Sequence, residues 1–183
     1  IQNLLDGKDT SVLMPTGGGK SICYQIPALC SNGIAIVISP LIALMKDQVE
    51  ALVKRGIPAL CIHSGLSYDK IDSILDNAIY GNYKLLYVSP ERLETDIFKT
   101  RVAKMNVSIL VVDECHCISQ WGYDFRPAYL EIAKIKEIIP ENVPTIAVTA
   151  TATPIVVEDI KEKLCLKNCN LFKTGFERAN LSY

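Results

Sequence analysis

The sequence lacks an excess of basic residues, a hydrophobic run long enough to cross a membrane, and any repeat or low-complexity tract. Its 183 residues include 19 lysines and arginines and 20 aspartates and glutamates, which give a formal net charge of −1. No overall positive field therefore attracts nucleic acid, and any surface that binds it must be local. Without an apolar stretch of membrane-spanning length and without a signal-peptide pattern in its first residues, the sequence predicts no membrane contact.

Zinc-site spacing is also missing among the seven cysteines. The two close pairs, Cys115 with Cys117 and Cys165 with Cys169, are not separated as the ligands of zinc sites usually are. We therefore expect no zinc in this segment. Reduced thiols imply a reducing compartment.

Hydrophobic residues make up 49% of the chain, enough for the core of one globular domain over residues 1–183. Short apolar runs alternate with helical patterns along the whole length. Strands are expected at residues 11–14, 34–39, 59–62, 85–89, 109–113 and 145–149, with a weaker one at 170–172. Helices are expected to start near residues 20, 41, 68, 90, 127 and 154. The alternation predicts an α/β domain of three layers, in which helices cover both faces of a mostly parallel sheet.

A glycine-rich loop lies between the first expected strand and helix. Residues 14–21 read Met-Pro-Thr-Gly-Gly-Gly-Lys-Ser, and a loop of this kind cradles phosphate with its backbone N–H groups. The expected phosphate contacts are Thr16, Gly17, Gly18, Gly19, Lys20 and Ser21. Lys20 is expected to reach the terminal phosphates, and the hydroxyl of Ser21 to bind Mg²⁺. Met14 stands where the usual pattern has glycine, so a flexible turn is the alternative.

Two carboxylates follow the apolar run at residues 107–112. Asp113 is expected to bind Mg²⁺ and Glu114 to orient or deprotonate the attacking water, as in a nucleotide hydrolase. His116 comes next and is a candidate to sense the terminal phosphate through a hydrogen bond. The alternative is that this acidic pair is only the solvated end of a strand.

Other strands also run into polar signatures at their C-terminal ends. These are Ser39-Pro40, Ser89-Pro90 and Thr149-Ala150-Thr151. Open α/β sheets bind ligands at this edge, and so many signatures suggest a second, extended ligand. Ordinary helix caps are an equal alternative for each of them. Basic residues nearby, such as Lys46 and Arg92, are typical of solvated helix surfaces.

An aromatic-rich stretch, residues 117–129, directly follows the acidic pair. Aromatic and arginine side chains interleaved in this way can stack on bases and contact phosphate. The candidate nucleic-acid or coupling residues here are Gln120, Trp121, Phe125 and Arg126. Composition alone slightly favours the alternative, a small hydrophobic cluster beneath a loop.

Together these motifs resemble the RecQ DNA helicases, in order and over nearly the whole chain. The similar segments are residues 14–29 (phosphate loop and following helix), 39–48 (motif Ia), 87–93 (motif Ib), 113–116 (the DExH form of motif II), 118–127 (the aromatic-rich loop), 147–152 (motif III) and 176–181 (the exit toward a second motor domain). The aromatic-rich loop makes the resemblance specific to this family. Tyr123 stands where many members have histidine, so a proton-linked role for that position is not implied.

The resemblance implies the first RecA-like motor domain of a 3′-to-5′ helicase of superfamily 2. ATP and Mg²⁺ are the implied cofactors, and single-stranded and partially duplex DNA is the implied substrate, in repair or recombination. The aromatic loop would couple bound DNA to ATP hydrolysis. A second RecA-like domain of the same polypeptide is the implied partner, with a Gln motif expected upstream. We expect little or no turnover from this segment alone.

Two other classes of protein are alternatives to the helicase interpretation. A GTPase should carry an Asn-Lys-x-Asp motif, which the sequence lacks, and a small-molecule kinase has no use for Glu114 as a water activator. A nucleic-acid-binding module with an inactive ATP site is the non-enzymatic alternative. The presence of Lys20, Ser21, Asp113 and Glu114 counts against it.

Overall fold

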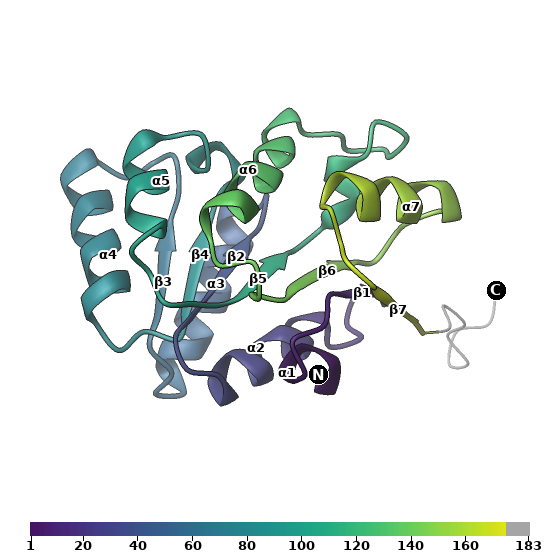
Figure 1. The fold of residues 1–183 in the computed structure, drawn as a ribbon. Helices are drawn as coiled ribbons and strands as arrows, with labels where there is room; N and C mark the ends of the chain where they lie inside the picture. The colour runs from purple at the N-terminus through teal and green to yellow at the C-terminus, as the bar shows by residue number, and fades with distance from the viewer. Residues whose placement is uncertain (175–183) are drawn as a thin grey trace.

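The computed structural model describes residues 1–174 of the chain, and the expected exit segment at 176–181 lies outside them. Within these residues, seven strands form one sheet in the order β3-β4-β2-β5-β6-β1-β7 (Figure 1). Every strand pair is parallel. The strands are β1 (Thr10–Leu13), β2 (Ile34–Ile38), β3 (Ala59–Ile62), β4 (Leu85–Val88), β5 (Val107–Val112), β6 (Thr145–Thr149) and β7 (Asn170–Lys173).

Helices cover both faces of the sheet, as Figure 1 shows. The α-helices are α1 (Gln2–Leu5), α2 (Lys20–Cys30), α3 (Ile42–Lys54), α4 (Tyr68–Tyr80), α5 (Asp96–Val102), α6 (Glu131–Ile138) and α7 (Pro154–Lys163). One core cluster includes buried residues of α4, α5, α6 and α7, and the other includes residues of α1, α2 and α3. The expected three-layer α/β architecture is therefore confirmed.

The central strand β2 illustrates why this sequence forms such a sheet. Ile34, Ile36 and Ile38 pack into one core cluster, while Ala35 and Val37 pack into the other. Successive side chains of a strand point to opposite faces, so a strand buried on both faces must be apolar throughout. Full burial of each large side chain contributes about 1.5–3 kcal/mol, which favours this strand at the centre of the domain.

Two expected helices begin later than the sequence patterns suggest. Short 3₁₀ turns occupy their starts, η1 (Pro90–Arg92) and η3 (Pro127–Leu130), while α5 begins at Asp96 and α6 at Glu131. In the first case, Thr95 is the N-cap of α5, and its hydroxyl donates to the carbonyl of Arg92 at 2.7 Å. Side-chain bonds of this kind compete with continued helix. No helix among the described residues is long and apolar enough to span a membrane.

Candidate nucleotide site and nucleic-acid interface

The side chains predicted to function gather at one edge of the sheet, where the strands end. β5 lies between β2 and β6 in the sheet, and β1 follows β6. Ser39, Asp113 and Thr149 therefore stand at the ends of three consecutive strands, and the phosphate loop leaves β1 at the same edge. The Met14 N–H donates to the Thr149 carbonyl at 3.1 Å and fixes the first residue of the loop. Parallel topology thus brings these distant motifs together.

The phosphate loop has a backbone conformation that requires glycine. Gly17 and Gly19 have φ angles of 82° and 86°, which strain any other residue. A Cβ atom on Gly18 would lie 2.9 Å from the Pro15 carbonyl oxygen. Backbone N–H groups in such a loop form an anion-binding nest. Because α2 begins directly after Gly19, its positive dipole end faces the same place. The loop therefore fits a phosphate group.

Lys20 provides the cation of the site. Its Nζ lies 3.5 Å from the Met14 carbonyl oxygen. Its charge lowers the pKa of Glu114 and Asp113, against the larger opposing effect of their burial. The ammonium group is therefore within electrostatic reach of both carboxyl groups. Ser21 follows in the first turn of α2, where it is partly exposed.

Asp113 is buried and held by three hydrogen bonds. Its Oδ2 accepts a hydrogen bond from Ser39 Oγ at 3.3 Å, and its Oδ1 accepts one from the Glu114 N–H at 3.0 Å. The Tyr129 hydroxyl donates to its backbone carbonyl at 2.8 Å. Burial, and then the charge of Glu114, raise the pKa of Asp113 to about 6. Its carboxylate is thus ionised at neutral pH at a cost in desolvation, which a bound divalent cation relieves.

Glu114 and His116 follow in a strained turn. Glu114 has a φ of 46°, which is uncommon for a residue other than glycine and recurs at functional sites. His116 Nδ1 lies 2.8 Å from Thr149 Oγ1 and 3.4 Å from Glu114 Oε2. Because burial lowers the pKa of His116, the imidazole is neutral at pH 7 and its contact with Glu114 is not a charged ion pair. His116 therefore links the ends of β5 and β6.

The aromatic segment, residues 119–126, presents two large side chains to solvent. Trp121 is 76% exposed and Tyr123 is fully exposed, so neither belongs to a buried hydrophobic cluster. Phe125 is half-buried, and Lys163 of α7 lies over its ring, with Nζ 5.9 Å from the centroid. In this segment, one aromatic side chain therefore packs against α7, and two others are exposed to solvent.

A cavity of about 230 Å³ separates the aromatic segment from the start of α7. His116, Trp121 and Tyr123 line one side, and Thr151 and Val156 line the other. The cavity therefore touches the end of motif II, the aromatic segment and motif III at once. Thr151 itself is exposed, and its backbone N–H donates to Thr149 Oγ1 at 3.2 Å.

Arg126 joins the aromatic segment to the end of β2. Its Nη1 donates to the Pro40 carbonyl at 3.2 Å, and its Nη2 donates to Asp124 Oδ2 at 3.2 Å. The guanidinium therefore already donates hydrogen bonds to acceptors within the protein. Gln120, in contrast, is exposed.

The Ser-Pro signatures are mostly buried and not at the surface. Ser39, Ser89 and Pro90 are buried, while Pro40 is partly exposed. Ser39 Oγ bonds to Asp113, and Ser89 Oγ has no hydrogen-bond partner within the described residues. Both serine side chains are therefore buried and are not open to a direct contact with DNA.

Sequence reasoning missed two structural contacts of the site. Tyr129 is fully buried against Asp113; its place in the aromatic-rich stretch was the only signal. Arg92, expected as a solvated charge, instead donates to the carbonyls of His63 (3.3 Å) and Ser64 (3.1 Å). It therefore ties the end of β4 to the loop after β3.

Comparisons with known proteins all find helicases. The profile of the DEAD/DEAH box helicase family matches residues 1–160. The ATP-dependent DNA helicase RecQ of Haemophilus influenzae is 45% identical over 183 residues, which are 100% of this chain and 29% of that protein. RecQ of Bacillus subtilis is 48% identical over 176 residues, 96% of this chain and 30% of that protein. The ATP-dependent DNA helicase Q1 of Rattus norvegicus is 43% identical over 183 residues, 96% of this chain and 29% of that protein.

Solved structures share the same fold at lower identity. A hypothetical ATP-dependent RNA helicase from Sulfolobus tokodaii superposes with a TM-score of 0.72 and 20% identity, over 95% of this chain and 50% of that one. The helicase MrfA bound to DNA superposes with a TM-score of 0.71 and 20% identity, over 94% of this chain and 26% of that one. The chain spans about three tenths of the length of the curated relatives above.

Proposed function

Since the chain belongs to the DEAD/DEAH box helicase family, we infer that it is the ATP-binding half of a DNA helicase motor of the RecQ type. The motor couples ATP hydrolysis to 3′-to-5′ movement on single-stranded DNA and to the unwinding of partially duplex DNA. Its place is repair or recombination, in the bacterial cytoplasm or the eukaryotic nucleus. A second RecA-like domain of the same polypeptide completes the site.

One observation carries this proposal: a phosphate-binding loop, the buried carboxyl group of Asp113 and the partly exposed carboxyl group of Glu114 lie within electrostatic reach of one ammonium group, that of Lys20. Lys20 follows the glycines, and its charge acts on Asp113 and Glu114. A nucleotide hydrolase needs a phosphate cradle, a metal ligand and a group that activates water, all in one place. An unrelated glycine turn or solvated strand end does not bring these three together.

The residues present fit Mg²⁺-ATP. Ser21 and Asp113 would hold the ion, which neutralises charge that develops on the phosphates. Asp113 is positioned beforehand by its bonds to Ser39 and to the Glu114 N–H. Glu114 would orient the attacking water and accept its proton, and Lys20 would bind the terminal phosphates. His116, neutral and bonded to Thr149, would carry a change at the phosphates to the end of β6.

The exposed aromatic side chains support the DNA-binding part of the proposal. Trp121 and Tyr123 offer stacking surfaces that need no particular base. Phosphate contacts near Pro40 and Pro90 would position the strand without reading its sequence. Arg126 bonds to the Pro40 carbonyl. A movement of the aromatic segment when DNA binds would therefore be transmitted to the end of β2.

Nucleotide binding by residues 1–183 is the first test. We expect Mg²⁺-ATP to bind weakly, because the adenine-reading segment is expected upstream, and Lys20→Ala to abolish binding through loss of a charge on the phosphates. Lys104→Ala is the matched control, because Lys104 is an exposed lysine away from the loop. Calorimetry that gave Lys20→Ala the affinity of the unmodified chain would overturn the nucleotide assignment.

Turnover separates the helicase interpretation from its rivals. The fragment should hydrolyse ATP very slowly, because an arginine finger from another domain contributes about 10³–10⁵ in rate. The full-length protein should hydrolyse ATP faster when single-stranded DNA is added. An NTPase of another class would ignore DNA, and a binding module with an inactive site would bind DNA without turnover.

A further inference from the structure

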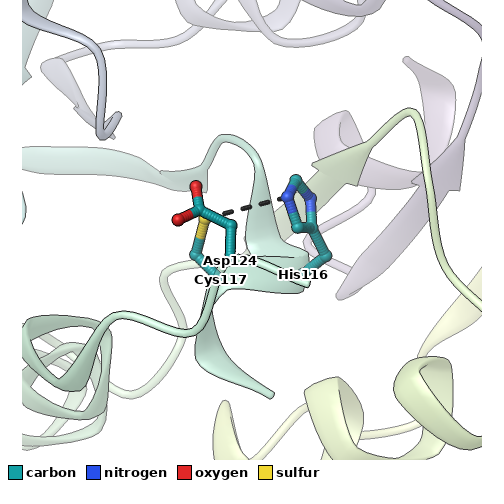
Figure 2. A group of neighbouring side chains, drawn as sticks. All are labelled: His116, Cys117 and Asp124. Carbon is teal, nitrogen blue, oxygen red and sulfur yellow. Dashed lines mark hydrogen bonds between the residues drawn. The ribbon is translucent and has the colours of Figure 1, made fainter. Parts of the chain in front are cut away.

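Three side chains that can bind metal lie close together, as Figure 2 shows: His116, Cys117 and Asp124. Cys117 Sγ lies 3.8 Å from His116 Nε2 and 3.7 Å from Asp124 Oδ2. The candidate ligand atoms of the three residues all lie within 4.8 Å of one another. The proposed helicase chemistry uses neither Cys117 nor Asp124, so their approach to His116 calls for another explanation.

The backbone, rather than chance side-chain rotamers, brings these residues together. His116 and Cys117 lie on the 3₁₀ turn η2 (Cys115–Ile118). The chain then folds back over this turn, since the Arg126 N–H donates to the Cys117 carbonyl at 2.8 Å. Gly122 permits the return, because a Cβ atom there would lie 2.9 Å from the His116 carbonyl oxygen. Asp124 is thereby placed beside Cys117.

The imidazole of His116 is oriented as a metal ligand requires. Thr149 Oγ1 lies 3.2 Å from the Thr151 carbonyl, to which it can donate its proton, and it can then accept a hydrogen bond from His116 Nδ1, at 2.8 Å. The carboxylate of Glu114, 3.4 Å from the same Nδ1, can only accept. Nδ1 therefore carries the proton, and the lone pair of Nε2 faces Cys117. Metal-binding histidines are typically held by an outer hydrogen bond of this kind.

We propose that His116 Nε2, Cys117 Sγ and a carboxylate oxygen of Asp124 form a binding site for one Zn²⁺ ion, with the fourth position open to solvent. Nitrogen, sulfur and oxygen donors in a tetrahedral set suit zinc. Bonds of the usual length place the donor atoms of such a set roughly 3.3–3.8 Å apart. Two of the three separations already have this size.

Small adjustments complete the site. The side chain of Asp124 is 53% exposed, so it can rotate to shorten its distance to His116. Arg126 bonds to Oδ2 of Asp124, whereas Oδ1 accepts no hydrogen bond from the residues that the structure describes. As the zinc–sulfur bond forms, the thiol of Cys117 releases its proton to solvent.

These requirements make the site weaker than a closed structural zinc site. Arg126 competes for the Asp124 carboxylate, and the Cys117 thiol must lose its proton as it binds the ion. Binding of the ion would therefore be reversible, and occupancy of the site would depend on the zinc concentration. While bound, it would tie the aromatic segment to η2. If the proposed helicase function holds, the bound ion lowers DNA-stimulated turnover.

Cobalt binding tests the site directly, with Co²⁺ as a spectroscopic substitute for Zn²⁺. The chain should bind one equivalent of Co²⁺ with thiolate-to-cobalt charge-transfer absorption, and Zn²⁺ should displace it. Cys117→Ser should lose this absorption, and Asp124→Asn should weaken binding at least tenfold. Cys30→Ser is the matched control, because Cys30 is an exposed thiol at the end of α2; it should bind as the unmodified chain does.

The same titration contains the results that overturn the proposal. They are an absence of thiolate absorption in the unmodified chain, or unchanged absorption in Cys117→Ser. Circular dichroism checks that each variant folds, and Asp124→Asn, changed at a half-exposed side chain, remains decisive if Cys117→Ser does not fold. Lys20→Ala should bind Co²⁺ normally, so a failure of the nucleotide assignment would leave this result intact. Zn²⁺ should also raise the melting temperature of the unmodified chain and not that of Cys117→Ser.

Discussion

The nucleotide half of the site and the aromatic segment lie side by side but are built differently. Asp113 is 8% exposed and bonded through both carboxylate oxygens, whereas Trp121 is 76% exposed. The phosphate loop is fixed by glycine geometry and by its hydrogen bond to β6. The aromatic segment is held by fewer contacts. Among them are the contact of Lys163 with the Phe125 ring and the hydrogen bond from Arg126 to the Pro40 carbonyl.

This difference follows the physical demands of the two tasks. Stabilising charge on a phosphate requires fixed groups that need no rearrangement during the reaction. Stacking on bases of any sequence requires exposed, adaptable aromatic faces. Substitutions in the first region should therefore affect chemistry or folding stability, and substitutions in the second should affect DNA binding and the stimulation of turnover by DNA.

The largest effect should come from Glu114→Gln in the full-length protein. Removal of the group that activates water should lower DNA-stimulated turnover by about 10²–10⁴-fold and leave ATP binding intact. Steady-state ATPase assays and calorimetry measure the two quantities. Glu141→Gln is a control, since Glu141 is an exposed glutamate remote from the site. Normal turnover in Glu114→Gln would remove Glu114 from its assigned role.

Asp113→Asn should raise the free energy of unfolding at pH 8 and abolish the binding of Mg²⁺-ATP. The pKa of Asp113 is about 6 in the folded chain, against an ordinary value of 3.8, so the folded state binds the proton more tightly than the unfolded state does. The stability that Asp113 contributes is complete below about pH 4 and is lost as the pH rises through 6. Because its amide side chain is neutral, the Asp113→Asn variant should be more stable than the unmodified chain at pH 8, by up to about 3 kcal/mol.

Urea unfolding in the absence of Mg²⁺ at pH 8 and near pH 4 measures this change. The advantage of the variant should shrink at the lower pH, while its binding of Mg²⁺-ATP is lost. A variant that was less stable than the unmodified chain at both pH values would mean that the bonds of Ser39 and the Glu114 N–H to the carboxylate outweigh its desolvation.

Trp121→Ala should weaken binding of single-stranded DNA by the full-length protein by about 1–3 kcal/mol. The melting temperature should stay the same, because the indole is mostly exposed. Fluorescence anisotropy and thermal unfolding on one preparation give both values. Tyr80→Ala is the control, since Tyr80 is an 80% exposed aromatic residue at the end of α4. A large fall in melting temperature would instead assign Trp121 a packing role.

The smallest effect should come from Tyr129→Phe. The variant loses only the hydrogen bond from the hydroxyl to the Asp113 carbonyl, which corresponds to about 0.5–1.5 kcal/mol of unfolding free energy. Tyr68→Phe, at an exposed tyrosine, is the control. Chemical denaturation measures both, and equal stability of the two variants would show that the buried bond contributes nothing.

The fold and the main motifs could be predicted from the sequence because their signals are local. Apolar runs mark the strands, and glycines next to Lys20 mark the phosphate loop. The parallel topology then fixes that motifs at strand ends share one edge. Even the weak seventh strand was predicted, although β7 is exposed throughout.

The contacts within the site could not be predicted in the same way. Arg126 and Pro40 are 86 positions apart, and Ser39 and Asp113 are 74 apart. Such pairs depend on how loops fold over the sheet edge, which no periodic pattern records. The approach of Asp124 to His116 and Cys117 depends in the same way on the chain reversal at Gly122, and zinc-ligand spacing rules gave no sign of it.

The central claim is that the aromatic segment couples DNA to a preformed nucleotide site. The most direct test is the ATPase rate of the full-length protein with Trp121→Ala, measured with and without single-stranded DNA. The rate without DNA should equal that of the unmodified protein, because Trp121 lies outside the phosphate loop and the carboxylate pair, and the stimulation by saturating DNA should be largely lost. Full stimulation in this variant would contradict the account.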